Sequence, residues 1–266
     1  MSTDTAPAAV EESAIALAER MADAAAEITR RHFRGDFAVE GKEDRSPVTI
    51  ADREAEMALR TVLGDHRPDD GVIGEEFGVE RGDARDVWVL DPIDGTRAFI
   101  TGKPTFGTLI ALVRDGRPVL GVIDQPIVGD RWVGAAGHPT RHNGRPVTTR
   151  TCGNFAAAYA STTGPHLFAS DSDLAAFERV ADRVRDTVYG MDCYAYGLLA
   201  SGHLDLVIES GLKIHDFAAL VPVVEGAGGA MRDWTGRPLT AESSGRVLAL
   251  GDPSLLDATL ALLGEA

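Results

Sequence analysis

The stretch "VWVLDPIDGTRAFITG", residues 87–102, places two aspartates three positions apart at the end of an apolar run. The run "VWVL" is apolar throughout, which predicts a buried strand that ends near the core. Asp91 and Asp94 would then lie close together, with few basic residues nearby in the sequence. Two carboxylates that are held together without compensation raise each other's pKa or bind a cation. The stretch therefore predicts either a perturbed acid pair or a cation site.

The donor atoms of this stretch favour a hard cation. Carboxylate oxygens without His or Cys are the ligands that Mg²⁺ prefers, and the backbone carbonyl of Ile93 can add a further oxygen. Gly95 allows a tight turn, and with Thr96 it is expected to open a helix whose free N–H groups can hold a phosphate. A metal site beside a phosphate site predicts hydrolysis of a phosphate ester.

Three other acidic positions belong to the same hypothesis, and each has a simpler explanation when taken alone. Thr49 is the expected N-cap of the helix over 49–64, and Asp52, three residues on, would alone be a capping residue of that helix. Asp216 alone would be an N-cap. Glu75 lies in "GEE", residues 74–76, which reads as a solvated loop. The Asp-Pro and Asp-Gly pairs of "DPIDGT" are common turn dipeptides, and Thr96 could cap the next helix. Only the combination of these pieces favours a site.

The composition narrows the class of protein. A chain of 266 residues is long enough for one large or two moderate domains. The formal net charge of −15 argues against nucleic acid or an anionic membrane as a partner, but not against a small phosphate that binds through metal ions. No apolar run approaches the roughly 20 residues of a membrane span, and the N-terminus lacks the pattern of a secretory signal. The two cysteines, Cys152 and Cys193, make no disulfide framework, so we expect a cytoplasmic protein.

The hydrophobic periodicity predicts two halves with different patterns. Residues 1–147 are expected to form an α+β domain, with helices beside a largely antiparallel sheet, and this domain would carry most metal ligands. Residues 148–266 alternate strands and helices and predict an α/β domain that contributes Asp216 and the substrate-binding residues. The expected elements are helices around 17–28, 49–64, 173–184, 193–202 and 216–229, a last helix opened by Asp252 and Pro253, strands at 71–74, 86–90, 156–162, 186–192 and 204–210, a hairpin over 106–126, and a turn at Asn143-Gly144 between 131–137 and 144–150.

The order of Asp52, "GEE", "DPIDGT" and Asp216 with glycines downstream resembles the inositol monophosphatase family of Mg²⁺-dependent, lithium-sensitive sugar phosphatases. The resemblance extends from residue 46 to "AGG" at 227–229. It implies a layered αβαβα sandwich with the site between the two halves. Two positions depart from the family pattern: His215 replaces a tryptophan, and Gly226 stands where an acidic residue is frequent. Neither position is expected to bind metal, and both suggest a branch away from the inositol phosphatases proper.

The resemblance also implies a role for each acidic residue. Glu75, Asp91 and the Ile93 carbonyl would hold one Mg²⁺ ion. Asp91, Asp94 and Asp216 would hold a second. A third and weaker ion would share Glu75. The catalytic set is Asp52, Thr96 and Glu75, in which Asp52 with Thr96 would orient and deprotonate the attacking water. The N–H groups of Gly95 and Thr96 would bind phosphate oxygens, beside Asp216.

Within this family, the sequence resembles the histidinol-phosphatase branch. Arg97-Ala98-Phe99 stands where inositol enzymes have Thr/Leu-Asn-Phe, and "GVIDQP" and "GMDCYAY" are similar to that branch. By resemblance, Glu209 points at the non-phosphate end of the substrate, and Asp192 replaces a small residue. Two acids would suit the amine and imidazole of L-histidinol phosphate. Equally, Asp192 could simply cap a helix that begins at Cys193.

The remaining candidates have structural explanations. His203 and His215 could touch the site, but we expect each of them in a loop or packing contact. We expect Trp88 and Phe106 in the core. Lys42 either matches a family lysine or is a solvated loop residue. Arg185, or a basic residue of a second copy in a homodimer, could close the pocket. Competing functions are hydrolysis of inositol 1-phosphate, fructose 1,6-bisphosphate or 3′-phosphoadenosine nucleotides, and non-catalytic binding on a phosphatase scaffold.

Overall fold

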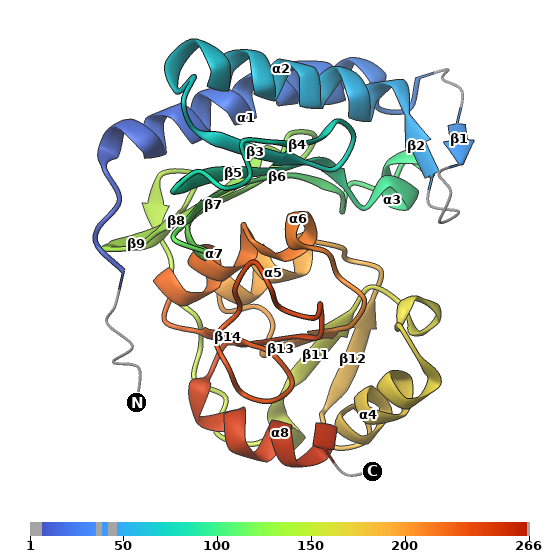
Figure 1. Cartoon of the computed structure of the whole chain (residues 1–266). Helices are drawn as coiled ribbons and strands as arrows, with labels where there is room; N and C mark the ends of the chain where they lie inside the picture. Colours follow the sequence, from blue (N-terminus) through green and yellow to red (C-terminus); the bar gives the residue numbers. More distant parts are fainter. Residues whose placement is uncertain (1–6, 36–38, 42–46, 265–266) are drawn as a thin grey trace.

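Two long helices form the outer layer of the N-terminal half. The computed structural model describes residues 7–35, 39–41 and 47–264, so the Lys42 hypothesis lies outside the described residues. Helices α1 (Glu12–His32) and α2 (Ile50–His66) pack together on one face of the larger sheet (Figure 1). A small hairpin of β1 (Val39–Gly41) and β2 (Pro47–Thr49) precedes α2. Helix α2 begins at the predicted N-cap and ends two residues beyond the predicted stop.

The larger sheet has the order β10-β9-β8-β7-β6-β5-β3-β4 and is antiparallel except for the β3–β5 pair. Its strands are β3 (Gly71–Gly74), β4 (Gly78–Glu80), β5 (Asp86–Asp94), β6 (Gly107–Arg114), β7 (Arg117–Gln125), β8 (Asp130–Ala135), β9 (His138–His142) and β10 (Arg145–Pro146). The predicted hairpin is confirmed as β6–β7. The expectation of one turn between 131–137 and 144–150 was wrong, because β9 lies between them and the Asn143-Gly144 turn joins β9 to β10.

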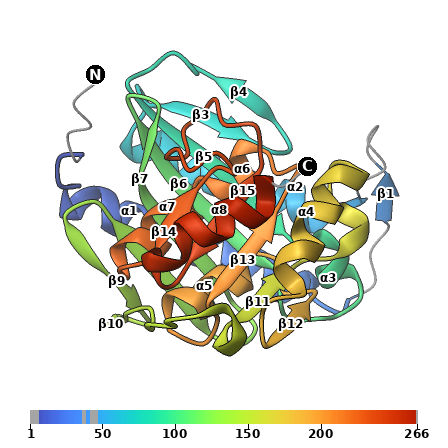
Figure 2. The same cartoon turned by 90° about the horizontal axis from the view of Figure 1, so that it is seen from below.

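The smaller sheet has the order β12-β11-β13-β15-β14, with β11 parallel to both of its neighbours. Its strands are β11 (Tyr159–Thr162), β12 (Asp186–Tyr189), β13 (Leu206–Glu209), β14 (Ala230–Arg232) and β15 (Val247–Leu250). Helices α4 (Asp171–Ala181) and α8 (Leu256–Gly264) cover its outer face, as Figure 2 shows from below. Short 3₁₀ turns occupy Phe155–Ala157, Pro165–Leu167 and Pro253–Leu255.

A middle layer of short helices separates the two sheets. It consists of α5 (Tyr194–Ala200), α6 (Ile214–Phe217) and α7 (Leu220–Gly226). The single helix expected over 216–229 is therefore divided in two. Pro222 explains the division, because proline is tolerated in the first turn of a helix, where its missing N–H is not needed, and not in the interior.

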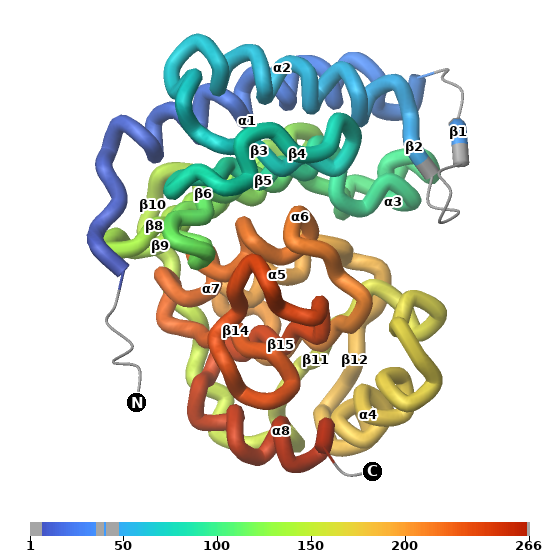
Figure 3. The backbone as a smooth tube through the Cα atoms, in the orientation of Figure 1, coloured from blue at the N-terminus to red at the C-terminus, as the bar shows by residue number. Residues whose placement is uncertain are grey.

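Helix α7 approaches the larger sheet closely because two strand residues lack side chains. A Cβ atom on Gly121 would lie 1.9 Å from the Ala219 carbonyl oxygen, and one on Gly134 would lie 2.3 Å from the Pro222 carbonyl oxygen. Any larger residue at either position would push the helix away from the sheet. This contact also fixes α6, which lies between the end of β5 and the smaller sheet (Figure 3).

The five layers confirm the predicted αβαβα sandwich. Three buried apolar clusters lie between successive layers, and Trp88 belongs to the one beneath α1 and α2. Phe106 is also buried, in a smaller cluster beside α3 (Thr96–Ile100). The boundary proposed near residue 147 falls between the strands of the two sheets, and the division into domains stays a prediction. None of the helices in the described ranges is long and apolar enough to span a bilayer.

Candidate active site

The end of β5 is irregular at the two aspartates of "DPIDGT". Asp91 pairs with Leu109 and Asp94 with Gly107, so the register with β6 shifts between them. Such a bulge bends the strand and re-aims its side chains. The Ile93 N–H donates to Asp91 Oδ1 at 3.1 Å, which fixes the turn. Asp91 is buried, whereas Asp94 is partly buried and accepts a 2.8 Å hydrogen bond from the Cys193 N–H.

Asp216 reaches the same place from the middle layer. It lies on α6, and its Oδ2 accepts a 2.6 Å hydrogen bond from the Lys213 N–H. The expectation that Asp216 is the N-cap was wrong, because Lys213 is the N-cap and Asp216 is the third residue of the helix. One carboxylate oxygen from each of Asp91, Asp94 and Asp216 lies within 4.8 Å of the other two. The structure thus brings together three of the predicted ligands from elements more than 120 residues apart in the sequence.

Glu75 follows β3, and its N–H donates to the Leu90 carbonyl at 3.2 Å, which holds it beside the end of β5. A buried residue that the sequence analysis missed, Glu56 on α2, supports this turn. Its carboxylate accepts hydrogen bonds from the N–H groups of Glu76 at 2.7 Å and Phe77 at 3.2 Å. It also accepts from Arg60 Nε at 2.8 Å. Its spacing of four residues from Asp52, one helical turn, is the signal that could have found it.

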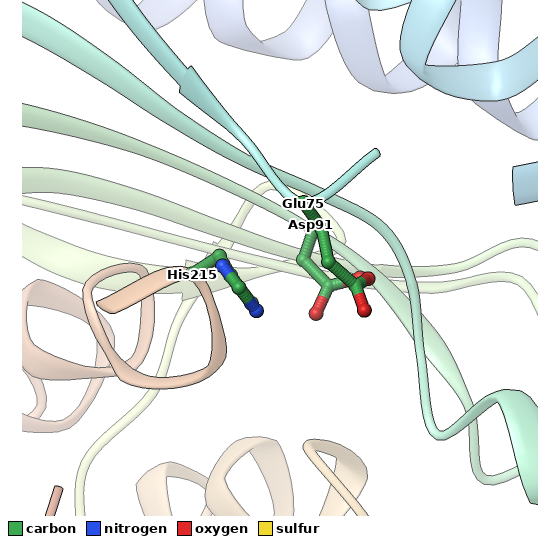
Figure 4. A group of neighbouring side chains, drawn as sticks. All are labelled: Glu75, Asp91 and His215. Carbon is green, nitrogen blue, oxygen red and sulfur yellow. The ribbon is translucent and has the colours of Figure 1, made fainter. Parts of the chain in front are cut away.

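His215 belongs to the site, which corrects the expectation that it lies in a loop or packing contact. One nitrogen of its ring and one carboxylate oxygen from each of Glu75 and Asp91 lie within 4.8 Å of one another. Figure 4 shows the imidazole opposite these two carboxylates. Its side chain is only 11% exposed. His203, in contrast, is exposed and lies in the loop before β13, as expected.

Asp52 is both a helix cap and a member of the site. Its Oδ2 accepts hydrogen bonds from the Thr49 N–H at 2.8 Å and the Thr49 hydroxyl at 2.6 Å, which completes a capping box. Its Oδ1 faces the Thr96 hydroxyl at 3.5 Å, and that hydroxyl donates to the Ile93 carbonyl at 3.2 Å. The two explanations offered for Asp52 therefore hold together.

The carboxylates of the site repel one another. Burial raises the pKa of Asp91 well above its usual range, and the charges of Glu75, Asp94 and Asp216 raise it further. Burial also raises the pKa of Asp94, with Asp192 and Asp216 adding to the shift. Within the part of the chain that the structure describes, neither Asp91 nor Asp94 forms an ion pair with Lys or Arg. An oxygen-rich, negatively charged and partly desolvated donor set of this kind fits a divalent cation.

A cavity of about 440 Å³ opens on these carboxylates, and Asp192, Glu209 and Gly95 line it as well. The alternative that Asp192 caps the next helix was wrong, because α5 starts after Cys193 without a side-chain cap. Instead, Asp192 Oδ2 accepts a 3.0 Å hydrogen bond from the Thr105 hydroxyl. A Cβ atom on Gly95 would lie 2.8 Å from the Asp192 carboxyl carbon, so only glycine allows this approach.

The two acids suggested for the substrate differ in how they are held. Glu209 is buried and accepts hydrogen bonds from the Thr163 N–H at 3.0 Å and the Tyr196 hydroxyl at 2.8 Å. Burial raises the pKa of Glu209 and of Asp192.

Arg185 stacks on the Tyr159 ring and does not line the cavity, so this chain's Arg185 does not close the pocket.

Comparison with known proteins finds relatives over most of the chain. The family model of the inositol monophosphatase family matches residues 11–265. The chain is 52% identical over 236 residues to the bifunctional phosphatase IMPL2 of Arabidopsis thaliana, covering 88% of this chain and 68% of that protein. It is 36% identical over 235 residues to the histidinol-phosphatase of Chlorobaculum parvum, covering 88% of this chain and 90% of that protein.

A solved structure of an inositol monophosphatase from Zymomonas mobilis is 54% identical, with a TM-score of 0.88 and coverage of 95% of this chain and 98% of that one. The matching family model, the curated relatives and the shared fold lead to one conclusion: this chain belongs to the inositol monophosphatase family, whose members are generally metal-dependent phosphatases that act on phosphate monoesters.

Proposed function

We propose that this phosphatase hydrolyses L-histidinol phosphate to L-histidinol and phosphate, and that it serves histidine biosynthesis. The observation that carries the proposal is the position of Asp192. Its partly buried carboxylate lines the cavity that opens on Asp91, Asp94 and Asp216, and it accepts a hydrogen bond from Thr105. The charges of Lys103 and Arg97 are near enough to lower its pKa, but among the described residues no Lys or Arg forms a hydrogen bond with it. A cationic amine of the substrate would pair directly with this charge, whereas a neutral polyol would not. The similarity to a histidinol-phosphatase supports the same substrate.

Mg²⁺ fits the donor set of the site. Glu75, Asp91 and the Ile93 carbonyl would hold one ion, Asp91, Asp94 and Asp216 a second, and a third would share Glu75. When bound, the ions neutralise the phosphate, acidify the attacking water and stabilise the leaving alkoxide. Inhibition by lithium is expected on the same basis, because lithium would compete for one of these positions.

Asp52 and Thr96 are placed to handle the attacking water. The Thr96 hydroxyl lies between Asp52 Oδ1 and the Ile93 carbonyl, and its single proton can be donated to either acceptor. In the orientation toward Asp52 it can take a proton from water and pass its own to Oδ1. Burial raises the pKa of Asp52, which brings this carboxylate closer to the range of a useful general base. Asp52 would accept the proton through Thr96, while the N–H groups of Gly95 and Thr96 bind phosphate oxygens.

A second candidate is hydrolysis of inositol 1-phosphate, which the similarity to the Zymomonas mobilis inositol monophosphatase favours. That substrate would leave the carboxylates of Asp192 and Glu209 beside neutral hydroxyl groups. We further expect a homodimer in the cytoplasm, from the resemblance and from the cysteine content, respectively.

The substrate is tested by kcat/KM for L-histidinol phosphate and for myo-inositol 1-phosphate, in the wild type, in Asp192→Ala and in the control Asp186→Ala, whose side chain is exposed at the start of β12. Loss of a charged contact with the substrate lowers kcat/KM by about 10- to 100-fold. We expect Asp192→Ala to lower the value for L-histidinol phosphate by this factor, with a change below about threefold for myo-inositol 1-phosphate. Equal losses on both substrates, or a wild-type preference for inositol phosphate, would contradict the proposal.

A further inference from the structure

The proposed metal ligands Glu75, Asp91, Asp94 and Asp216 all offer oxygen atoms. One nitrogen donor, that of His215, lies beside Glu75 and Asp91 and has no role in that assignment. We infer that His215 supplies an imidazole ligand to the metal position formed by Glu75 and Asp91, and that this position consequently prefers Mn²⁺ or Zn²⁺ to Mg²⁺. The inference rests on the proposed metal-dependent function and concerns the identity of the ion. It also gives a physical meaning to the replacement of the family's tryptophan at this position.

The placement of His215 follows from the way α6 docks on the larger sheet. Helix α6 contacts β5 and β6, and it presents His215 and Asp216 at consecutive positions. Asp216 reaches the group with Asp91 and Asp94, whereas His215 reaches the group with Asp91 and Glu75. One short helix thus contributes one donor to each of the two groups, and Asp91 is shared by both.

The donor atoms are near enough to share one ion. Zinc lies about 2.0–2.2 Å from nitrogen and carboxylate oxygen, so two ligands of a tetrahedral ion are about 3.4 Å apart. The donor atoms of Glu75, Asp91 and His215 lie within 4.8 Å of one another. Binding of an ion would therefore require the three side chains to draw together.

The donor chemistry determines the ion that is favoured. Mg²⁺ prefers oxygen ligands and keeps its waters, so an imidazole in its shell brings little affinity. Imidazole suits Zn²⁺ and other first-row transition ions, whose affinities for mixed nitrogen and oxygen sites exceed those of Mg²⁺. A tryptophan at this position would have no lone pair to offer, because its indole nitrogen is only a hydrogen-bond donor.

His215 also has a competing role, because its ring lies near Asp216. Its Nε2 lies 3.6 Å from Asp216 Oδ1, so the ring could act as a partner of that carboxylate rather than as a ligand. The two roles differ in one measurable property, which is whether the imidazole nitrogen is bonded directly to the ion.

Electron spin-echo envelope modulation on the full chain loaded with Mn²⁺ detects that bond through the ¹⁴N nucleus. We expect ¹⁴N modulation in the wild type and in His166→Gln, a control that removes a histidine lining the cavity that opens on the carboxylates. The modulation should be absent in His215→Phe and His215→Gln. Calorimetry should show weaker binding of Mn²⁺ to both His215 variants by about tenfold or more, with the affinity for Mg²⁺ unchanged within about twofold.

The outcomes separate this inference from the proposed function. Mn²⁺ bound to the wild type without ¹⁴N modulation would overturn the role of His215 as a ligand and leave the metal-dependent phosphatase intact. Failure of the wild type to bind either Mn²⁺ or Mg²⁺ would overturn both. Two His215 variants are used so that at least one keeps a native thermal transition. Loss of modulation in a variant with a native thermal transition supports the inference.

Discussion

The Thr96 hydroxyl oxygen lies 3.5 Å from Asp52 Oδ1, although the two residues are 44 positions apart. Asp52 comes from the first turn of α2, and Thr96 comes from the turn after β5. The second oxygen of Asp52 is already bound to Thr49, so the carboxylate cannot rotate freely. A rigid acid thus faces a hydroxyl whose other acceptor is the Ile93 carbonyl, and this pair is the proposed proton acceptor of the reaction.

Removal of the Thr96 hydroxyl tests this pair. Thr96→Val keeps the shape of the side chain and should lower kcat by about 10²-fold or more, since positioned proton transfer contributes about 10²–10⁴-fold. Thr96→Ser keeps the hydroxyl and should remain within about tenfold of the wild type. Steady-state rates and thermal melting of both variants give the answer. Equal rates for Val and Ser would show that the hydroxyl is not used.

Replacement of Asp94 by Asn separates activity from stability. The variant should lose measurable phosphatase activity because a charged ligand is gone. In metal-free buffer its melting temperature should equal or exceed that of the wild type, because the charge repelled by Asp192 and Asp216 is removed. Rates and melting curves in metal-free and Mg²⁺ buffers test both parts. An active Asp94→Asn enzyme would refute the assignment of Asp94 as a metal ligand.

Glu56 is expected to position Glu75 without touching the substrate. Glu56→Gln keeps the size of the side chain but turns an amide NH₂ toward an N–H donor, because both oxygens of Glu56 already accept. The free energy of unfolding should fall by about 1–3 kcal/mol. The Mg²⁺ concentration for half-maximal activity should rise by about tenfold, as for other residues that support a ligand.

The matched control for Glu56 is Glu80→Gln. Glu80 also binds Arg60, at 2.7 Å, but it is exposed and does not contact the turn that carries Glu75. Its variant should leave the Mg²⁺ requirement unchanged. A Glu56→Gln enzyme with a normal Mg²⁺ requirement at saturating substrate would limit Glu56 to a purely structural role.

Asp252 should make the stability of the protein depend on acidic pH. Hydrogen bonds from Ser254 and from the N–H of Cys152 lower the pKa of this carboxyl to about 2. An unfolded aspartate titrates near pH 3.9. Because the folded pKa is the lower one, the stabilisation is complete above about pH 4 and is lost as the pH falls from about 4 to about 2.

The Asp252→Asn variant measures that contribution directly. Its deficit in unfolding free energy should be present at pH 6 and should shrink as the pH is lowered toward 2.5, in urea titrations. Asp257→Asn, which removes an exposed carboxylate from the next turn, is the control. A deficit that stays constant over this pH range would contradict the role of the Asp252 charge.

Local sequence patterns predicted those parts of the fold that local interactions determine. The apolar run before Asp91, the helix start at Thr49 and the hairpin over 106–126 all appear as expected, because each depends on neighbours within a few residues. The division of α6 from α7 also has a local signal in Pro222, which the periodicity of 216–229 concealed.

His215 and Asp192, for which the sequence also offered structural explanations, are placed in the site by long-range packing. His215 faces Glu75 only because α6 and α7 dock on the larger sheet, and that docking requires the absence of side chains at Gly121 and Gly134. Nothing within the segment around His215 indicates this contact. Likewise, Asp192 follows a pattern typical of a helix cap, and its actual contact, with Thr105, comes from the turn before β6 in the N-terminal half.

The central claim, that the buried carboxylates exist to bind catalytic cations, is tested most directly by phosphate release from L-histidinol phosphate while Mg²⁺ is added to the metal-depleted enzyme. We predict no release above the uncatalysed rate without metal, saturable activation by Mg²⁺, and no activation in Asp91→Asn. Full activity in the presence of excess chelator, or Mg²⁺ activation of Asp91→Asn equal to that of the wild type, would contradict the account.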